Sequence, residues 1–338
     1  MSASLALLAD IGGTNARFAL ADTQQRAPLI VDSVRQFDVA HFPTLTDAAR
    51  HYLDALPISG GNVRSAVFAI AGRINGDEVR ITNHPWVISR AATQRALGLD
   101  TLRLVNDFAA QAMAIQLLTG DDLVAIGGVP LTPSSAASRT YAVLGPGTGL
   151  GVSALIVRDA QHIALETEGG HVSFASGTPE EVAILERLAL QYGRVSNERL
   201  VSGGGLVNIH RALSLIAGEA TPSLRPQDIT AGAARGDARC RHSVAVFCGV
   251  FGAIAGDLAL TLGAWDGVFL TGGLVPRLLA DLQQSSFRQR FEAKGRFAAA
   301  MARVPTVAVV HPQAGLLGAA AFALQDAPAM RPVAQVVG

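Results

Sequence analysis

Lysine is nearly absent from this chain, because Lys294 is its one lysine among 338 residues. A P-loop nucleotide site places a lysine ammonium on the phosphates through a Gly-Lys-Ser/Thr sequence, and a protein kinase needs a strand lysine and a His-Arg-Asp loop. Lys294 stands instead in Ala-Lys-Gly-Arg-Phe, so both classes of phosphate site are excluded. Any phosphate chemistry here must therefore rely on backbone amides and a metal ion.

Cysteine is scarce, and neither sign of charge is in excess. The two cysteines, Cys240 and Cys248, form no Cys-x-x-Cys pair, which excludes a disulfide framework and a zinc or thiol-exchange motif. The 27 basic and 27 acidic side chains cancel, so no electrostatic attraction favours nucleic acid or an anionic membrane. We expect a cytoplasmic protein that binds small molecules, with no nucleic-acid or membrane partner.

Long apolar runs are also missing, with one exception over residues 244–265. This segment carries a single charge, Asp257, and is long enough to cross a bilayer. Small residues at Gly249, Gly252 and Gly256 suit close helix packing, and no other segment resembles a span. We therefore interpret it as a buried core helix.

The rest of the chain alternates short apolar runs with amphipathic stretches, which predicts an α/β protein. Its length allows about two domains. The expected strands are 4–9, 16–21, 65–70, 102–105, 141–144, 151–157, 267–270 and 307–310. The expected helices are 45–55, 108–118, 180–192, 205–217, 243–262 and 314–324, and residues 131–139 are expected to form a loop.

Two segments repeat one plan. Residues 10–20 and 145–155 each read as an apolar strand, a tight turn rich in glycine and threonine, and a second strand. Such an echo indicates two domains of related topology that face a common cleft. Two unrelated hairpins remain the alternative, because glycine-rich turns between strands are common.

Glycine turns of this kind can bind phosphate without lysine. Glycine lets the backbone adopt positive φ and present its N–H groups as a concave anion site. Asp10 precedes the first turn, where phosphates would repel its carboxylate unless it held Mg²⁺, although it could equally bond its own backbone in the turn. A third glycine turn, within residues 268–276, could admit an adenosine.

Polar residues gather on the loops. Asn106 and Asp107 follow an expected strand and precede an expected helix, so one of them could cap that helix, or Asp107 could accept a proton from an attacking hydroxyl. Glu168 and His171 flank two glycines in a loop that suits hydroxyl binding better than zinc, which usually takes more closely spaced histidines. Glu198 would by default be a first-turn carboxylate of a helix capped by Ser196.

Together these segments resemble the bacterial glucokinases of the sugar kinase/actin-like ATPase superfamily. The matching pieces occur in the family's order across nearly the whole chain, at residues 10–17, 82–86, 105–108, 145–151, 168–171, 196–199, 271–273 and 315–318. Single glycine motifs are weak evidence, whereas eight in order are strong. Because it lacks a cysteine-rich zinc motif, the chain resembles the non-zinc branch of these enzymes.

The resemblance implies a two-domain actin-like (ribonuclease H-like) α/β ATPase fold with an interdomain cleft. It further implies a small domain of residues 1–117 plus 311–327, a large domain of residues 118–310, and a homodimer. It implies ATP-dependent phosphorylation of D-glucose at the 6-hydroxyl with Mg²⁺. A kinase for another hexose or amino sugar, and a sugar-responsive regulator without catalysis, remain alternatives. Residues 72–86 and 166–171 would determine which sugar is bound.

The resemblance also assigns roles to individual residues. Asp107 becomes the catalytic base, and Asp10 the magnesium residue, acting through water. The expected glucose ligands are Asn106, Asp107, Glu168, His171 and Glu198. The expected nucleotide contacts are Asp10, Gly12, Gly13, Thr14, Gly147, Thr148, Gly149, Gly272 and Gly273. Lys294 receives no role.

Overall fold

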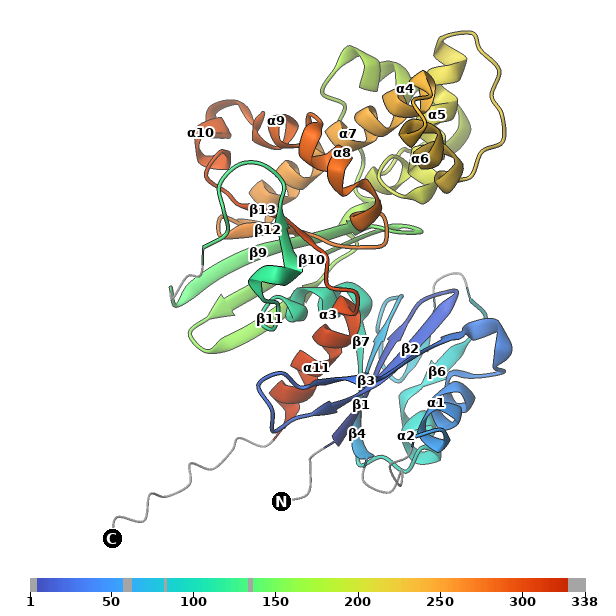
Figure 1. The fold of residues 1–338 in the computed structure, drawn as a ribbon, viewed down its shortest axis with the longest axis vertical. Helices are drawn as coiled ribbons and strands as arrows, with labels where there is room; N and C mark the ends of the chain where they lie inside the picture. The colour runs from blue at the N-terminus through green and yellow to red at the C-terminus, as the bar shows by residue number, and fades with distance from the viewer. Residues whose placement is uncertain (1–4, 57–62, 82–83, 133–135, 328–338) are drawn as a thin grey trace. The chain divides into compact units, whose positions relative to one another are not determined.

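The computed structural model describes residues 5–56, 63–81, 84–132 and 136–327. The chain divides into two compact units, unit 1 with Met1–Leu117 and Gln313–Gly338, and unit 2 with Leu118–Pro312. Each unit contains a mixed β-sheet covered by helices (Figure 1). The expected α/β fold class is confirmed by this architecture.

The sheet of unit 1 has five strands in the order β3-β2-β1-β4-β7. Their bounds are β1 (Leu5–Ile11), β2 (Asn15–Asp22), β3 (Leu29–Asp38), β4 (Val63–Ile70) and β7 (Thr101–Asn106). The first three strands form an antiparallel meander, while β1, β4 and β7 run parallel. The carboxyl ends of β1, β4 and β7 therefore share one edge.

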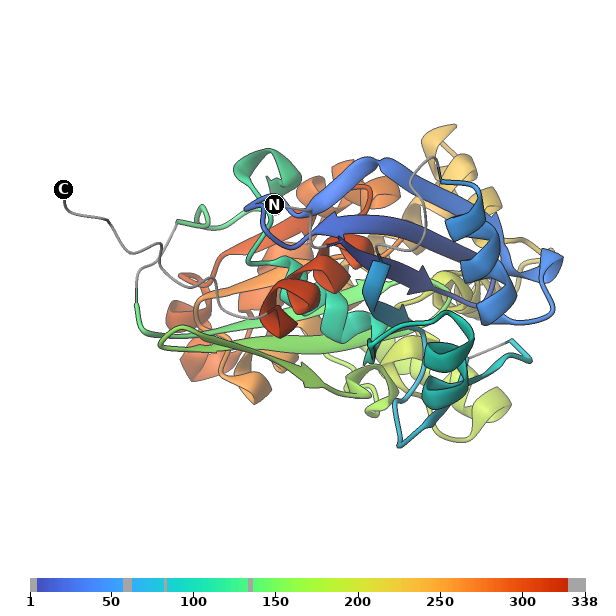
Figure 2. The same ribbon diagram turned by 90° about the horizontal axis from the view of Figure 1, so that it is seen from below.

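Helices cover both faces of this sheet (Figure 2). Their bounds are α1 (Leu45–Asp54), α2 (Arg90–Ala96), α3 (Asp107–Ala114) and α11 (Ala314–Asp326), and the smaller elements are η1 (Val39–His41), β5 (Glu78–Arg80) and β6 (Val87–Ser89). Leu7, Ala9 and Ile11 alternate along β1 and share a core with α1. On the other face, α11 packs on β1, β4 and α3, so closely that a β-carbon at Gly318 would overlap the Ala110 carbonyl oxygen.

The sheet of unit 2 has six strands in the order β11-β10-β9-β12-β13-β8. Their bounds are β8 (Leu123–Ala125), β9 (Ser138–Pro146), β10 (Leu150–Arg158), β11 (Gln161–Glu166), β12 (Gly267–Leu270) and β13 (Thr306–Val309). The first five strands repeat the order and the directions of the unit 1 sheet, with an antiparallel meander followed by two parallel strands. The interpretation of two related topologies is therefore confirmed, and unrelated hairpins are excluded.

Helix α7 forms the centre of the helical layer of unit 2. The helices of this unit are α4 (Pro179–Tyr192), α5 (Gly203–Ile216), α6 (Pro226–Ala234), α7 (Ala238–Leu262), α8 (Leu279–Gln284), α9 (Phe287–Glu292) and α10 (Ala298–Met301). Its 3-10 turns are η3 (Gly120–Asp122), η4 (Gly169–His171), η5 (Asn197–Arg199), η6 (Pro276–Leu278) and η7 (Gly295–Phe297). Gly252 and Gly256 of α7 lie against the carbonyl oxygens of Phe287 and Phe291 in α9, where a β-carbon would collide.

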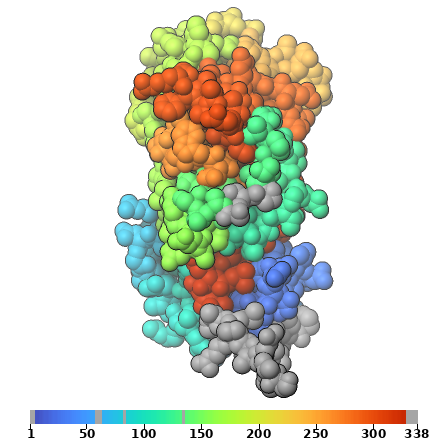
Figure 3. Space-filling model, turned by 90° about the vertical axis from the view of Figure 1, so that its left-hand side faces the viewer, coloured from blue at the N-terminus to red at the C-terminus, as the bar shows by residue number. Residues whose placement is uncertain are grey.

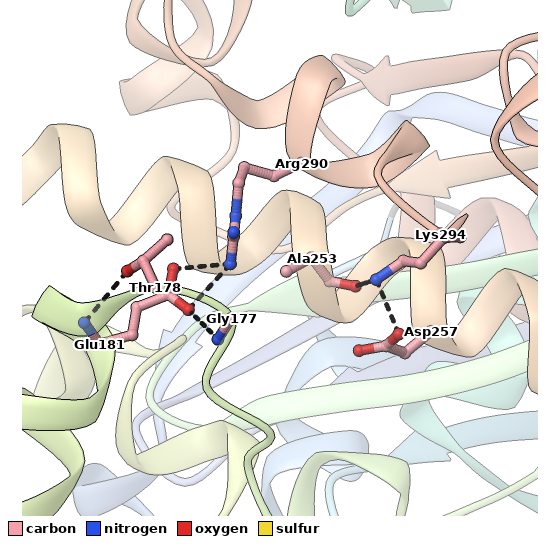
Figure 4. A network of polar contacts seen from close by, with 7 residues as sticks. All are labelled: Gly177, Thr178, Glu181, Ala253, Asp257, Arg290 and Lys294. Carbon is pink, nitrogen blue, oxygen red and sulfur yellow. Dashed lines mark hydrogen bonds and ion pairs between the residues drawn. The ribbon is translucent and has the colours of Figure 1, made fainter.

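Within the described residues, α7 alone has the length and hydropathy of a membrane span, and 67% of its apolar window is buried inside the structure. The interpretation of this segment as a core helix is confirmed. Lys294 now has a role, because its Nζ donates to the Ala253 carbonyl at 2.8 Å and to Asp257 Oδ1 at 2.7 Å, which fastens the segment between α9 and η7 to α7 (Figure 4).

Two further polar contacts fasten other segments of unit 2 to α8 and α9. Arg290 Nη2 donates to both carboxylate oxygens of Glu181 at 2.7 and 2.8 Å, and the Gly177 N–H donates to Glu181 Oε2 (Figure 4). Gln283 Nε2 donates to the Ala125 carbonyl at 3.1 Å, so the segment that carries β8 lies beside the orange-red helices on the face shown in Figure 3.

The expected elements are present, with different ends in several cases. The expected helix 108–118 ends at Ala114, because the chain tightens there into i→i+3 bonds such as Leu117 N–H to Ala114. The expected helix 243–262 begins earlier, at Ala238, where the Asp237 side chain caps it. The expected loop 131–139 overlaps β9 by two residues, since Ser138 pairs with Arg158, and its residues 133–135, like residue 4, lie outside the described residues.

Candidate functional site

The first group of site residues lies at the shared carboxyl edge of β1, β4 and β7. Asp10 pairs with Ala69, which pairs with Val105, the residue before Asn106. Neighbouring strands are about 4.8 Å apart, so Asp10 and Asn106 lie roughly 10 Å apart along this edge. That separation places Asp107 and the first glycine turn at the same end of unit 1.

Asn106 is the N-cap of α3. Its Oδ1 accepts the N–H groups of Phe108 and Ala109 at 2.9 and 3.1 Å, and its Nδ2 donates to the Gly72 carbonyl at 3.1 Å. Asp107 is the first residue of α3, is half-buried, and accepts the Phe108 N–H at 3.0 Å through Oδ1. Of the two capping candidates, Asn106 is the cap.

The first glycine turn, residues 12–14, joins β1 to β2. The Gly12 N–H donates to the Asn15 carbonyl at 2.9 Å, and the Thr14 carbonyl accepts the Val39 N–H at 3.1 Å. Thr14 is exposed at the tip. Behind the turn, Arg17 pairs with Asp10 across the two strands, with 3.3 Å between Arg17 Nη1 and Asp10 Oδ2.

Asp10 lies inside β1 and not in the turn, which excludes its interpretation as a turn residue. Its side chain is 21% exposed. Burial raises the pKa of the Asp10 carboxyl above its ordinary value, while the Arg17 guanidinium opposes that shift. On its other side the carboxylate contacts the first turn of α11, where a β-carbon at Gly315 would lie 2.7 Å from Oδ2.

The donors near Asp10 fit a magnesium ion held mainly by its substrate. Within the described residues, no three His, Cys, Asp or Glu side chains are grouped as a metal site, so neither a protein-built cage nor a zinc site is present there. Mg²⁺ commonly uses one or two carboxylates, several waters and substrate phosphates, and Asp10 can supply the carboxylate.

A pocket of about 420 Å³ lies beside the first glycine turn. Val39, whose N–H bonds to Thr14, lines it together with Phe42, His84 and Trp86. Trp86 Nε1 donates to the Phe42 carbonyl at 3.2 Å, which fixes the indole ring at the pocket wall. Residues 82 and 83 of the sequence motif that ends in Trp86 lie outside the described residues.

The second glycine turn, residues 147–149, joins β9 to β10 in unit 2. The Gly147 N–H donates to the Gly149 carbonyl at 2.8 Å, and the Gly203 N–H donates to the Gly147 carbonyl at 2.9 Å. Thr148 is exposed at the tip, as Thr14 is in unit 1. Gly272 has φ of 85° and lies so close to the end of β9 that a β-carbon there would be 2.7 Å from the Pro146 carbonyl oxygen. Gly273 follows it, so the third glycine turn adjoins the second.

The loop that carries Glu168 and His171 crosses the start of β10. A β-carbon at Gly170 would lie 2.0 Å from the Leu150 carbonyl oxygen, so glycine is required for this approach. Glu168 and His171 are 64% and 56% exposed, with 4.0 Å between Glu168 Oε2 and His171 Nε2. Two exposed polar side chains that face each other in this way can share the hydroxyls of one sugar.

Glu198 lies in the 3-10 turn η5, not in a longer helix. Ser196 is its N-cap residue but makes no side-chain capping bond, and its backbone pairs with Ser173 beyond the loop of residues 168–171. The Asn197 N–H donates to the Val172 carbonyl at 2.9 Å, and Arg194 Nη1 donates to the His171 carbonyl at 2.7 Å. These bonds bring Glu198 to the same part of unit 2 as Glu168 and His171.

The structure therefore places the expected site residues in two groups. Unit 1 holds Asp10, Gly12, Gly13, Thr14, Asn106 and Asp107, and unit 2 holds Gly147, Thr148, Gly149, Glu168, His171, Glu198, Gly272 and Gly273. Arg17 and Gly315 received no role from the sequence, although both contact Asp10. Arg17 could have been found, because a turn at 12–14 makes residues 10 and 17 cross-strand partners.

Comparisons with known proteins agree on one family. The glucokinase family model matches residues 7–326. A glucokinase from Stenotrophomonas maltophilia (strain R551-3) is 62% identical, over 95% of this chain and 96% of the relative. The crystal structure of a glucokinase from an Antarctic psychrotroph superposes with a TM-score of 0.83 at 33% identity, covering 96% of this chain and 100% of that one.

A more distant structure supports the fold alone. A ROK family glucokinase from Streptomyces griseus, crystallised with glucose and AMPPNP, has a TM-score of 0.63 at 20% identity, covering 95% of this chain and 99% of that one. The resemblance read from the eight motifs and the expected actin-like fold class are both confirmed. With a family model that spans nearly all of its length and relatives of more than 60% identity, this chain belongs to the glucokinase family.

Proposed function

We propose that this glucokinase family enzyme transfers the γ-phosphoryl group of ATP to the 6-hydroxyl of D-glucose. The family match supports a phosphotransferase over a regulator without catalysis. The observation that carries the proposal is the placement of Asp107. It follows the strand end marked by Asn106, at the first turn of α3, on the same sheet edge as Asp10 and the first glycine turn.

Asp107 is the proposed general base. Its carboxylate orients the 6-hydroxyl and takes the proton as the oxygen attacks phosphorus. Phosphoryl transfer demands little covalent work from the protein, so positioning and charge neutralisation supply most of the acceleration. The Asn106 side chain fixes the start of α3 by two hydrogen bonds to the first turn and a third to Gly72, which restricts the position of the adjacent carboxylate.

The proposed sugar ligands are Asn106, Asp107, Glu168, His171 and Glu198. Carboxylates accept from two neighbouring hydroxyls, and a neutral imidazole both donates and accepts. The bonds from Asn197 to Val172 and from Arg194 to His171 support this set, because they hold residues 168–171, the proposed sugar loop, beside the segment that carries Glu198. A panel of hexoses and amino sugars would show how strictly the group selects glucose.

The proposed nucleotide contacts are the two glycine turns, for the phosphates, and the turn at Gly272 and Gly273, for the adenosine. Asp10 would hold Mg²⁺ through water, and the bound ion would neutralise charge on the β- and γ-phosphates. Arg17 lies beside Asp10 and adds a second positive charge at the first turn. We further propose that the two compact units act as the two domains, and that the enzyme is a cytoplasmic homodimer.

Replacement of Asp107 tests the proposal most directly. Asp107→Asn keeps the size of the side chain but removes the base, so we expect kcat to fall by roughly 10²- to 10⁴-fold. Glucose binding, followed by calorimetry, should change far less. Asp121→Asn, at an exposed carboxylate of η3, is the matched control and should retain full activity. Near-normal turnover of Asp107→Asn would place the base elsewhere.

A further inference from the structure

The Glu198 carboxylate lies directly on the second glycine turn. Its Oε2 accepts the N–H of Leu150, the residue that follows the turn, at 3.0 Å. A β-carbon at Gly149 would lie 2.4 Å from the same oxygen, so the carboxylate covers the α-carbon of a turn residue. One proposed sugar ligand is therefore also a structural part of a proposed phosphate turn.

The backbone around Glu198 is fastened on both sides. The Asn197 N–H bonds to Val172 next to the sugar loop, and the Gly203 N–H bonds to Gly147 in the turn. The Ser202 hydroxyl donates to the Glu198 carbonyl at 2.8 Å, which closes the short segment between these two anchors. Residues 197–203 thus connect the sugar loop to the phosphate turn, and the Glu198 side chain adds a direct bond to the turn.

Glu168 provides the contrast within the same group. Its side chain is 64% exposed, its contact with His171 is 4.0 Å long, and it belongs to the sugar loop itself. Glu198 is half-buried and 48 residues from the amide that it accepts. A charged acceptor strengthens a hydrogen bond about twofold over a neutral one, so the charge of Glu198 matters to the turn.

We infer that Glu198 couples the two substrates, because the carboxylate that we propose as a sugar ligand also holds the phosphate turn through Oε2. A sugar hydroxyl bound to Oε1 would restrict the carboxylate and so restrict the turn that receives the nucleotide phosphates. The inference rests on the proposed function, since it takes Glu198 as a sugar ligand and residues 147–149 as a phosphate turn. Linkage makes the effect reciprocal, so bound nucleotide should tighten sugar binding by the same factor.

The first test compares Glu198→Gln with Glu168→Gln. Calorimetry would give Kd for glucose and, with and without saturating glucose, Kd for Mg-AMPPNP. Both variants should bind glucose more weakly. Glu198→Gln should also bind Mg-AMPPNP roughly three- to tenfold more weakly without glucose, because its neutral amide holds Leu150 less firmly, and should lose the tightening by glucose. Glu168→Gln should bind Mg-AMPPNP as the natural enzyme does when glucose is absent.

The second test approaches the same contact from the turn. Gly149→Ala must displace the Glu198 carboxylate, so it should raise Kd for glucose severalfold even without nucleotide. Gly120→Ala, whose β-carbon would meet open space outside both proposed sites, is the control and should leave Kd for glucose unchanged. This pair decides the matter alone if Glu198→Gln fails to fold, as judged by circular dichroism.

The outcomes separate the coupling from the proposed function. If Glu198→Gln weakens glucose binding but leaves nucleotide binding intact, or if Gly149→Ala and Gly120→Ala bind glucose equally, the coupling is overturned and the sugar site stands. If neither glutamate variant weakens glucose, the proposed sugar site itself is wrong. Loss of nucleotide tightening in Glu198→Gln, together with weaker glucose binding in Gly149→Ala, supports the coupling.

Discussion

The two glycine hairpins share a topology but differ in where their carboxylates originate. In unit 1, Asp10 belongs to the hairpin and faces its cross-strand partner Arg17. In unit 2 the strand before the turn ends in Gly145 and Pro146, and the carboxylate that reaches the turn, Glu198, arrives from 48 residues away. The same backbone topology thus receives its carboxylate from two different places. We associate the first carboxylate with the proposed metal binding, and the second with the proposed coupling of sugar and nucleotide binding.

Both carboxylates nevertheless rest on a glycine. A β-carbon would approach Asp10 Oδ2 to 2.7 Å at Gly315, and Glu198 Oε2 to 2.4 Å at Gly149. The first glycine lies in a helix from the far end of the chain, whereas the second lies in the turn itself. The hairpin in unit 1 is therefore supported by α11, and the hairpin in unit 2 by the segment 197–203 that carries Glu198.

The largest effect should separate Asp10 from Glu198. Asp10→Asn removes the proposed magnesium carboxylate, so we expect kcat to fall by roughly 10²-fold or more and the Mg²⁺ requirement to rise. Glu198→Gln should leave the Mg²⁺ dependence unchanged. Titration of the rate with Mg²⁺ measures both, with Asp32→Asn, an exposed carboxylate of β3, as control. Equal Mg²⁺ dependence in Asp10→Asn and the natural enzyme would remove the distinction between the hairpins.

The Asp10→Asn variant should be more stable than the natural enzyme although it is less active. An acid whose pKa is raised in the folded chain contributes stability below its unfolded pKa, and that contribution is lost as the pH rises through the folded pKa. At neutral pH the ionised Asp10 therefore lowers the free energy of unfolding, and Asn in its place removes this penalty. We expect a higher Tm for Asp10→Asn at pH 7 and a smaller difference near pH 4, about the ordinary pKa of Asp. A lower Tm at pH 7 would contradict the direction of this shift.

A smaller effect should follow from Gly315→Ala. The added methyl group must move the Asp10 carboxylate, and a misplacement of about 1 Å can cost up to 10²-fold in rate. We expect kcat to fall roughly ten- to a hundredfold, with Kd for glucose unchanged. Gly120→Ala, where a β-carbon meets open space, is the control. In the Asp10→Asn background the substitution should add little, and full additivity would show that Gly315 does not act through Asp10.

The smallest catalytic effect should come from Lys294 in unit 2. Arg17 pairs with Asp10 at the first turn, while Lys294, 11% exposed, fastens the segment between α9 and η7 to α7. Lys294→Met should cost about 1 to 3 kcal/mol of stability through its lost hydrogen bonds and leave kcat and KM unchanged. Thermal unfolding and steady-state kinetics would show this, with the exposed Arg296→Met as control. Altered nucleotide kinetics in Lys294→Met would give this residue a role that the contacts do not indicate.

The sequence predicted the parts of the fold in which local pattern and tertiary position agree. The strands of both hairpins are apolar runs that flank glycine turns, and α7 is recognisable from its length and its glycines. Strand β3 was missed, because as an edge strand it carries exposed polar residues such as Asp32 and Arg35, and the short elements β5, β6, α8, α9 and α10 contain too few residues for a period to appear.

The candidate site was likewise predictable only where local sequence patterns reveal it. Residues that share a motif could be identified from sequence, and the structure brings Glu168, His171 and Glu198 together in unit 2. The residues that hold these site residues in place could not be identified from sequence. The bond from Leu150 to Glu198 joins residues 48 apart, and the contact of Gly315 with Asp10 joins opposite ends of the chain. Such contacts depend on the packing of elements and leave no periodic signal.

The return of α11 to the first sheet sets an order for biosynthesis. Residues 314–326 cover the face of β1 and β4 that includes Leu8, yet the ribosome makes them after all of unit 2. Unit 2 is continuous and can fold as soon as it emerges, whereas the first 117 residues must wait with one apolar face open. A nascent chain that stops short of α11 would therefore present that face to chaperones and proteases, however well its other half had folded.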